Sequence, residues 1–159
     1  MKTKNSSFMT HAAMIAAIYV VLTFIFAPFS FGDIQVRISE ALTILPVFTP
    51  AAIPGLFVGC LIGNILGGAI LPDIIFGSLA TLLGACGTFL LRKHHQILCV
   101  LPPIIFNMII IPLILRFGYG MNLPIPFLMT TIGIGEIISC GFLGTILYYA
   151  LKKYRKIIF

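Results

Sequence analysis

The acidic residues of this chain are the side chains whose type and placement could do chemistry. Four are present among 159 residues, Asp33, Glu40, Asp73 and Glu136, in a sequence that is 60% hydrophobic and 9% charged. Three of them stand beside or inside apolar segments. A carboxylate inside a lipid bilayer costs several kcal/mol and is rarely tolerated without a partner or a ligand. We therefore expect these acids to bind something polar from within a membrane protein.

Each of these three acids also has an explanation that needs no ligand. Glu136 could form an ion pair with Arg116, or join a buried network of hydrogen bonds. Glu40 could pair with Arg37, which precedes it by three residues. Asp73 follows a proline at an expected helix start, where an aspartate often caps the helix. The residues alone leave both readings open for each acid.

Two amides strengthen the expectation of a ligand, although each alone could simply join two helices by a hydrogen bond. Asn64 is expected toward the outer end of the third helix and Asn107 near the middle of the fifth. Together with Glu40, Asp73 and Glu136, they would converge from five helices on the middle and outer half of one bundle. Packing alone does not explain such a convergence.

Composition and charge exclude most other classes of protein. A mean hydropathy of +1.15 is typical of a multi-spanning membrane protein. The net charge of +6 would suit nucleic acid, but eight of the ten basic residues form three clusters, at 2–4, 92–93 and 152–156. Basic clusters beside apolar segments mark the cytoplasmic side of a membrane. Nucleic-acid binding is therefore not expected.

The apolar segments predict six transmembrane helices. Four are clear: 8–27, 73–91, 96–117 and 123–151. The stretch 38–71 is too long for one helix, and a break at Thr49-Pro50 would divide it into two short helices of about 12 and 18 residues. Crossing twice there places all three basic clusters and both termini in the cytoplasm. The predicted fold class is an all-α membrane protein, with residues 1–159 forming a single compact bundle of six transmembrane helices.

Small residues predict close contacts between helices. Glycines recur every four residues in the third helix and form one smooth face: Gly55, Gly59, Gly63 and Gly67. The first helix carries two pairs of alanines offset by one residue: Ala12 with Ala16, and Ala13 with Ala17. Such faces let a neighbouring helix approach closely. The alanines could pack inside the bundle or dock another membrane protein.

Sequence motifs for catalysis and for metal binding are missing. The sequence has no phosphate-binding loop, no H-E-x-x-H and no G-x-S-x-G. The four cysteines lie far apart in hydrophobic segments, as small buried residues do, so no disulfide, zinc site or cofactor is expected. We expect no enzyme, although a membrane-embedded enzyme that uses Glu136 as acid or base stays an alternative. Uphill transport would need energy from another subunit.

Two stretches, residues 37–64 and 71–85, resemble the QueT family of queuosine-precursor transporters. The first reads Arg-Ile-Ser-Glu-Ala-Leu-Thr-Ile-Leu-Pro-Val-Phe-Thr-Pro-Ala-Ala-Ile-Pro-Gly, and the second begins Leu-Pro-Asp-Ile-Ile-Phe-Gly. Members of this family are the substrate-binding S components of energy-coupling factor (ECF) transporters. The resemblance covers most of the chain and implies a prokaryotic plasma-membrane protein.

The resemblance also implies partners and a docking site. An S component works with a transmembrane coupling subunit and two cytoplasmic ATPases, and it topples in the membrane to release its substrate inside. The family's Ala-x-x-x-Ala docking motif matches Ala12 and Ala16, with Ala13 and Ala17 as a second register.

The implied ligand is a 7-deazaguanine such as preQ1, which has a guanine-like edge and an aminomethyl cation. A carboxylate can accept two hydrogen bonds from a guanine edge, and another can hold the ammonium. We assign these two roles to Glu40 and Glu136, without saying which acid takes which. The remaining expected substrate-binding residues are Arg37, Asn64, Asp73 and Asn107, with Phe29, Phe31 or Tyr119 stacking on the ring.

Two other hypotheses stay open beside this one. The chain could be an S component for a different small vitamin-like solute. It could also be a structural partner protein that needs no ligand, in which case replacing Glu40 and Glu136 by alanine would change no affinity.

Overall fold

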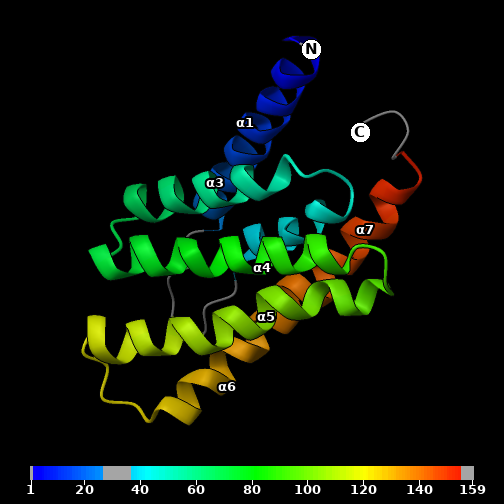
Figure 1. The fold of residues 1–159 in the computed structure, drawn as a ribbon. Coiled ribbons are helices and arrows are strands. Elements are labelled where there is room, and N and C mark those ends of the chain that lie inside the picture. Colours follow the sequence, from blue (N-terminus) through cyan, green and yellow to red (C-terminus); the bar gives the residue numbers. More distant parts are fainter. Residues whose placement is uncertain (1, 27–36, 155–159) are drawn as a thin grey trace.

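The structure is a computed structural model, which describes residues 2–26 and 37–154. Within these ranges every regular element is a helix, as Figure 1 shows. In chain order the elements are α1 (Lys2–Ile25), η1 (Ile38–Val47), α3 (Ala52–Leu66), η2 (Asp73–Gly77), α4 (Ser78–Leu91), α5 (Gln96–Leu113), η3 (Ile114–Gly118), α6 (Ile125–Glu136), η4 (Ile137–Leu143) and α7 (Gly144–Lys152). Phe29, Phe31 and Asp33 lie outside the described residues.

The four clear helices of the sequence are confirmed. Stretches long and apolar enough to cross a membrane run over Ser6–Ile25, Asp73–Leu91, Gln96–Gly118 and Ile125–Lys152. The last three join α-helices to π-helical turns, namely η2, η3 and η4. Such wide turns occur mostly as single insertions in α-helices, often at functional sites.

The break near Thr49-Pro50 is also confirmed, since η1 ends at Val47 and α3 begins at Ala52. However, η1 is a 3₁₀-helix of ten residues rather than an α-helix. At a rise of about 2.0 Å per residue it is about 20 Å long, against about 15 Å for the same residues as an α-helix. The described chain therefore has six helical stretches; that η1 and α3 each cross the membrane, and that both termini are cytoplasmic, stay predictions.

The short helix η1 occupies the centre of the molecule. Eight successive residues, Ser39–Pro46, are buried, because η1 packs against α1, α4, η4 and α7. In Figure 1 its cyan ribbon lies behind α4. This position carries the polar side chains of η1 into the interior.

The glycine face of α3 packs against α1, as its spacing predicts. A Cβ added at Gly59 would lie 2.8 Å from Cβ of Tyr19 and 3.1 Å from Cα of Ala16, and one at Gly55 would lie 2.7 Å from the carbonyl oxygen of Ala12. Only glycine permits so close an approach. The contact buries Ala16 and partly covers Ala12.

The second alanine register points elsewhere. Ala13 and Ala17 are exposed, as are Met14, Ile18 and Val21 on the same side of α1. The two registers therefore have different surroundings, one inside the bundle and one on its surface.

Candidate functional site

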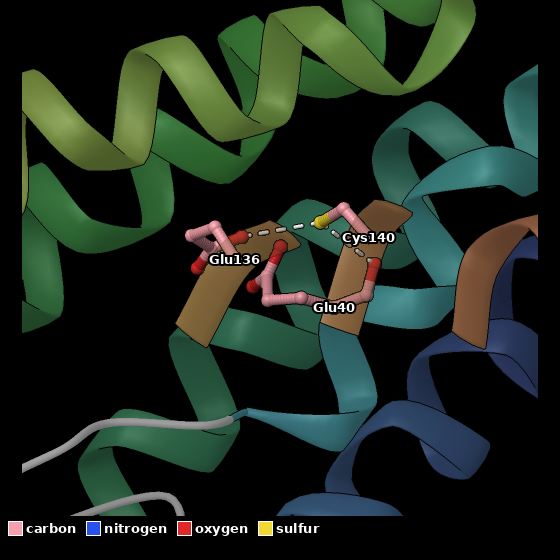
Figure 2. Close-up of side chains that lie close together, drawn as sticks. All are labelled: Glu40, Glu136 and Cys140. Atoms are coloured by element: carbon pink, nitrogen blue, oxygen red, sulfur yellow. Dashed lines mark hydrogen bonds between the residues drawn. The ribbon is translucent and has the colours of Figure 1, made fainter. Parts of the chain in front are cut away.

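Two carboxyl groups meet at the centre of the bundle. Glu40 comes from η1 and is 1% exposed, whereas Glu136 ends α6 and is 4% exposed. One carboxylate oxygen of each, together with Sγ of Cys140 in η4, lie within 4.8 Å of one another. Figure 2 shows the two carboxyl groups close together, with the thiol of Cys140 beside them. The predicted convergence of the acids is confirmed for this pair.

Glu40 is held on one side only. Tyr19 of α1 donates a hydrogen bond to Oε1, and Thr81 of α4 donates a second to the same oxygen at 3.2 Å. The other oxygen, Oε2, is buried and has no hydrogen-bond partner among the described residues. A buried acceptor that is left unsatisfied costs about 1–3 kcal/mol. One oxygen of Glu40 is thus held by two hydroxyl groups, and the amide of Asn107 also lies near the carboxylate.

Cys140 links the two acids. Its thiol lies 3.1 Å from Oε2 of Glu136 and 3.4 Å from the carbonyl oxygen of Glu40, in donor geometry to both. Thr43 in η1 donates to the same carbonyl at 2.6 Å. Cys140 follows Glu136 by four residues, which sets both side chains on one face of the helix.

A small hollow adjoins Glu136. Its volume is about 10 Å³, and it is lined by Arg37, Asn107, Ile111, Ile132 and Glu136. Asn107 lies near enough to both carboxyl groups to interact with them. This space holds about one water molecule.

Asp73 belongs to a second, separate cluster. Its Oδ2 lies 3.7 Å from Nη2 of Arg37 and accepts a hydrogen bond from the hydroxyl of Tyr119 at 3.1 Å. The amide of Asn64 donates to the carbonyl oxygen of Asp73 at 3.3 Å. Burial and the charge of Asp73 raise the pKa of Tyr119 above its ordinary value. Asn64, Asp73 and Tyr119 thus form a polar contact between helices beside the acid pair.

Of the explanations that need no ligand, one is confirmed, because Glu136 joins a buried network of hydrogen bonds through Cys140. The helix cap and the two ion pairs do not match the described contacts. Asp73 is the first residue of η2 and not its N-cap, which is Pro72. Its carboxylate accepts a hydrogen bond from Tyr119, and its other oxygen has no partner among the described residues, so the capping role is not supported. Arg37 pairs with Asp73 rather than with Glu40. Arg116 donates to the carbonyl oxygen of Met121 at 2.9 Å and not to Glu136.

Hydrogen bonds from neutral groups alone do not balance the acid pair. Two unit charges less than 5 Å apart repel by at least about 3 kcal/mol at an effective dielectric constant of about 20. Removing them from water costs several kcal/mol more. Arg37 lies beside the hollow, but its ion pair is with Asp73. A proton or a cationic ligand would therefore balance the acid pair best.

Sequence reasoning missed four residues of this site: Tyr19, Thr43, Thr81 and Cys140. The four-residue spacing from Glu136 was a usable signal for Cys140, which we expected only as a small buried residue. The others carry no such signal, because hydroxyl side chains are common in apolar helices and their partners are set by packing.

Comparison with known proteins gives a match over most of the chain. A family model described as "QueT transporter" matches residues 9–153. The chain is also 37% identical over 83 residues to a protein named "Queuosine precursor transporter QueT" from Lactococcus lactis subsp. cremoris (strain MG1363). That match covers 51% of this chain and 48% of the relative, so it spans about half the relative's length. No solved structure matches.

Proposed function

The chain belongs to the QueT transporter family, and from this premise we propose that it is the substrate-binding subunit of an ECF-type ABC transporter. It binds a queuosine precursor at the outer face of the plasma membrane, and partner subunits drive uptake with ATP. The family is one of membrane transporters, which sets aside the alternative of an enzyme using Glu136. The observation that carries the proposal is the buried acid pair, with one oxygen of Glu40 unpartnered.

The chemistry of a cationic 7-deazaguanine such as preQ1 suits this pair. Its ammonium supplies the positive charge that Glu40 and Glu136 lack, and its guanine-like edge offers N–H groups to the second carboxylate. Asn107 stands beside both acids, where its amide can pair with the ring carbonyl or N–H groups. A neutral analogue leaves the repulsion between the acids in place and should bind less well.

Binding requires the site to open. The hollow beside Glu136 has a volume of about 10 Å³, whereas pockets for drug-sized ligands measure about 300–1,000 Å³. The polar contact between Asp73, Arg37 and Tyr119 lies beside the hollow, since Arg37 belongs to both. We infer that substrate enters where this contact separates.

The exposed alanine register supports docking of the transmembrane coupling subunit. Ala16 is buried and Ala12 is partly covered where α3 packs against α1, so this register is largely used inside the bundle. Ala13 and Ala17 are exposed on α1 and keep the spacing of a small-residue contact. We therefore place the docking face at Ala13 and Ala17, with the two cytoplasmic ATPases acting through the coupling subunit.

Calorimetry of the purified protein against preQ1, preQ0, queuine and guanine tests the substrate. We expect preQ1 to bind at least about tenfold more tightly than neutral guanine, which corresponds to about 1.4 kcal/mol. Glu136→Gln and Glu40→Gln should each remove that preference. Heat with none of the four compounds would reject the substrate and favour an S component for another vitamin-like solute.

Docking is tested separately. Ala13→Trp should abolish uptake in cells while leaving preQ1 binding to the purified protein unchanged. Ala150→Trp is the matched control, because Ala150 is also an exposed alanine on a helix. Equal uptake by the two variants would reject the docking face.

A further inference from the structure

The cluster of Glu40, Glu136 and Cys140 has the donor atoms of a metal site. Two carboxylate oxygens and one sulfur lie within 4.8 Å of one another, and all three residues are buried. They come from η1, from the end of α6 and from η4 (Figure 2). Glu136 and Cys140 are four residues apart in the sequence, whereas Glu40 comes from a distant helix. The sequence spacing therefore does not reveal the full set of three donors.

A carboxylate oxygen without a hydrogen-bond partner supports the presence of a ligand in this cluster. Oε2 of Glu40 is buried and makes no hydrogen bond within the described part of the chain. The neighbouring guanidinium of Arg37 would oppose a cation, but it lies 3.7 Å from Oδ2 of Asp73, whose charge offsets it. The cluster of acids and thiol therefore keeps a net attraction for positive charge.

We propose that Glu40, Glu136 and Cys140 bind a divalent cation of borderline softness, with Zn²⁺ as the ion that fits best. Zinc takes cysteine sulfur and carboxylate oxygen together, usually with four ligands in tetrahedral arrangement. Calcium and magnesium prefer six or more oxygen ligands, which this set does not supply. Asn107, beside both acids, or a water molecule can complete the coordination. On binding, the thiol of Cys140 loses its proton to the solvent and the thiolate sulfur bonds to the metal.

The metal should also exclude the transported substrate. It would occupy the carboxylate oxygens that a cationic queuosine precursor needs, so Zn²⁺ should act as a competitive inhibitor of substrate binding. This consequence rests on the proposed function, whereas metal binding itself does not.

The test uses metal-free purified protein, with Zn²⁺ followed by calorimetry and Cd²⁺ as an optical probe. A cadmium–thiolate bond gives an ultraviolet charge-transfer absorption, which should appear with the native protein. Cys140→Ser should remove this absorption and weaken Zn²⁺ binding at least about tenfold. Cys99→Ser is the matched control, since Cys99 is equally buried but lies outside the cluster, and it should leave both signals unchanged.

Glu136→Gln provides a second variant in case loss of the thiol disturbs folding, and it should also weaken Zn²⁺ binding at least about tenfold. Native affinity for Zn²⁺ in both variants, or a cadmium absorption that survives in Cys140→Ser, would overturn the inference. A protein that binds preQ1 in the presence of a chelator but never binds Zn²⁺ overturns the metal site alone. Binding of Zn²⁺ without binding of any queuosine precursor overturns the proposed function alone.

Discussion

Two acidic clusters lie side by side in this bundle, and they differ in the groups that their carboxylates contact. Asp73 has the guanidinium of Arg37 and the hydroxyl of Tyr119 as partners. Glu40 and Glu136 accept hydrogen bonds from neutral groups that the structure describes, namely Tyr19, Thr81 and Cys140, and the amide of Asn107 lies beside both. An acid that already has its cation holds helices together. An acid pair that has no ion pair of its own among the described residues is suited to bind a cationic ligand.

The largest effect should come from removing the charge of Asp73. In Asp73→Asn, the buried guanidinium of Arg37 loses its ion pair with Asp73, and breaking a buried ion pair from one side costs about 3–5 kcal/mol. We expect the free energy of unfolding in detergent to fall by about 3 kcal/mol. A loss below about 1 kcal/mol would show that Asp73 does not hold the helices together. It would then resemble Glu40 and Glu136, and the contrast between the two clusters would be wrong.

Glu136→Gln should act in the opposite direction on stability. The variant relieves repulsion within the acid pair, so the empty protein should unfold at the same temperature or higher. Its affinity for preQ1 should fall about 100-fold, or about 2.7 kcal/mol, as measured by calorimetry. A variant that is destabilised and still binds preQ1 normally would show that Glu136 is structural.

Tyr19→Phe would sharpen the comparison by loosening the acid pair without changing its charge. The phenol is the donor from α1 that fixes Oε1 of Glu40, and a hydrogen bond to a charged group contributes about 1.5–3 kcal/mol. We expect preQ1 affinity to fall about tenfold. Equal affinity in the variant and the native protein would mean that Thr81 alone positions the carboxylate.

Tyr119→Phe should have the smallest effect. Tyr119 is 42% exposed, so losing its hydrogen bond to Asp73 should cost about 1 kcal/mol or less. Because the pKa of Tyr119 is raised in the folded state, its contribution is complete below about pH 10 and is lost as the pH rises through the folded-state pKa. The variant should lack this alkaline loss of stability, measured by unfolding at several pH values, while its preQ1 affinity stays within about twofold.

The sequence was sufficient for the long helices, for the break at Thr49-Pro50 and for the burial of Glu40 and Glu136, because hydropathy, proline and the cost of a buried charge are local signals. It was not sufficient for the partners of Asp73, which depend on how η2 meets Arg37 and Tyr119. The choice between the two alanine registers needed the orientation of α1 against the glycines of α3. Packing between α1 and α3 decides that orientation. The sequence shows two alanine pairs offset by one residue and does not indicate which of them faces α3.

The 3₁₀ geometry of η1 determines which of its side chains share a face. Side chains three residues apart eclipse one another in a 3₁₀-helix, whereas the 3.6 residues per turn of an α-helix would turn them about 60° apart. Glu40 and Thr43 of η1 have this spacing, and the hydroxyl of Thr43 lies 3.4 Å from Sγ of Cys140. The tight winding of η1 thus lets one short helix present a carboxyl and a hydroxyl group on the same side, toward η4.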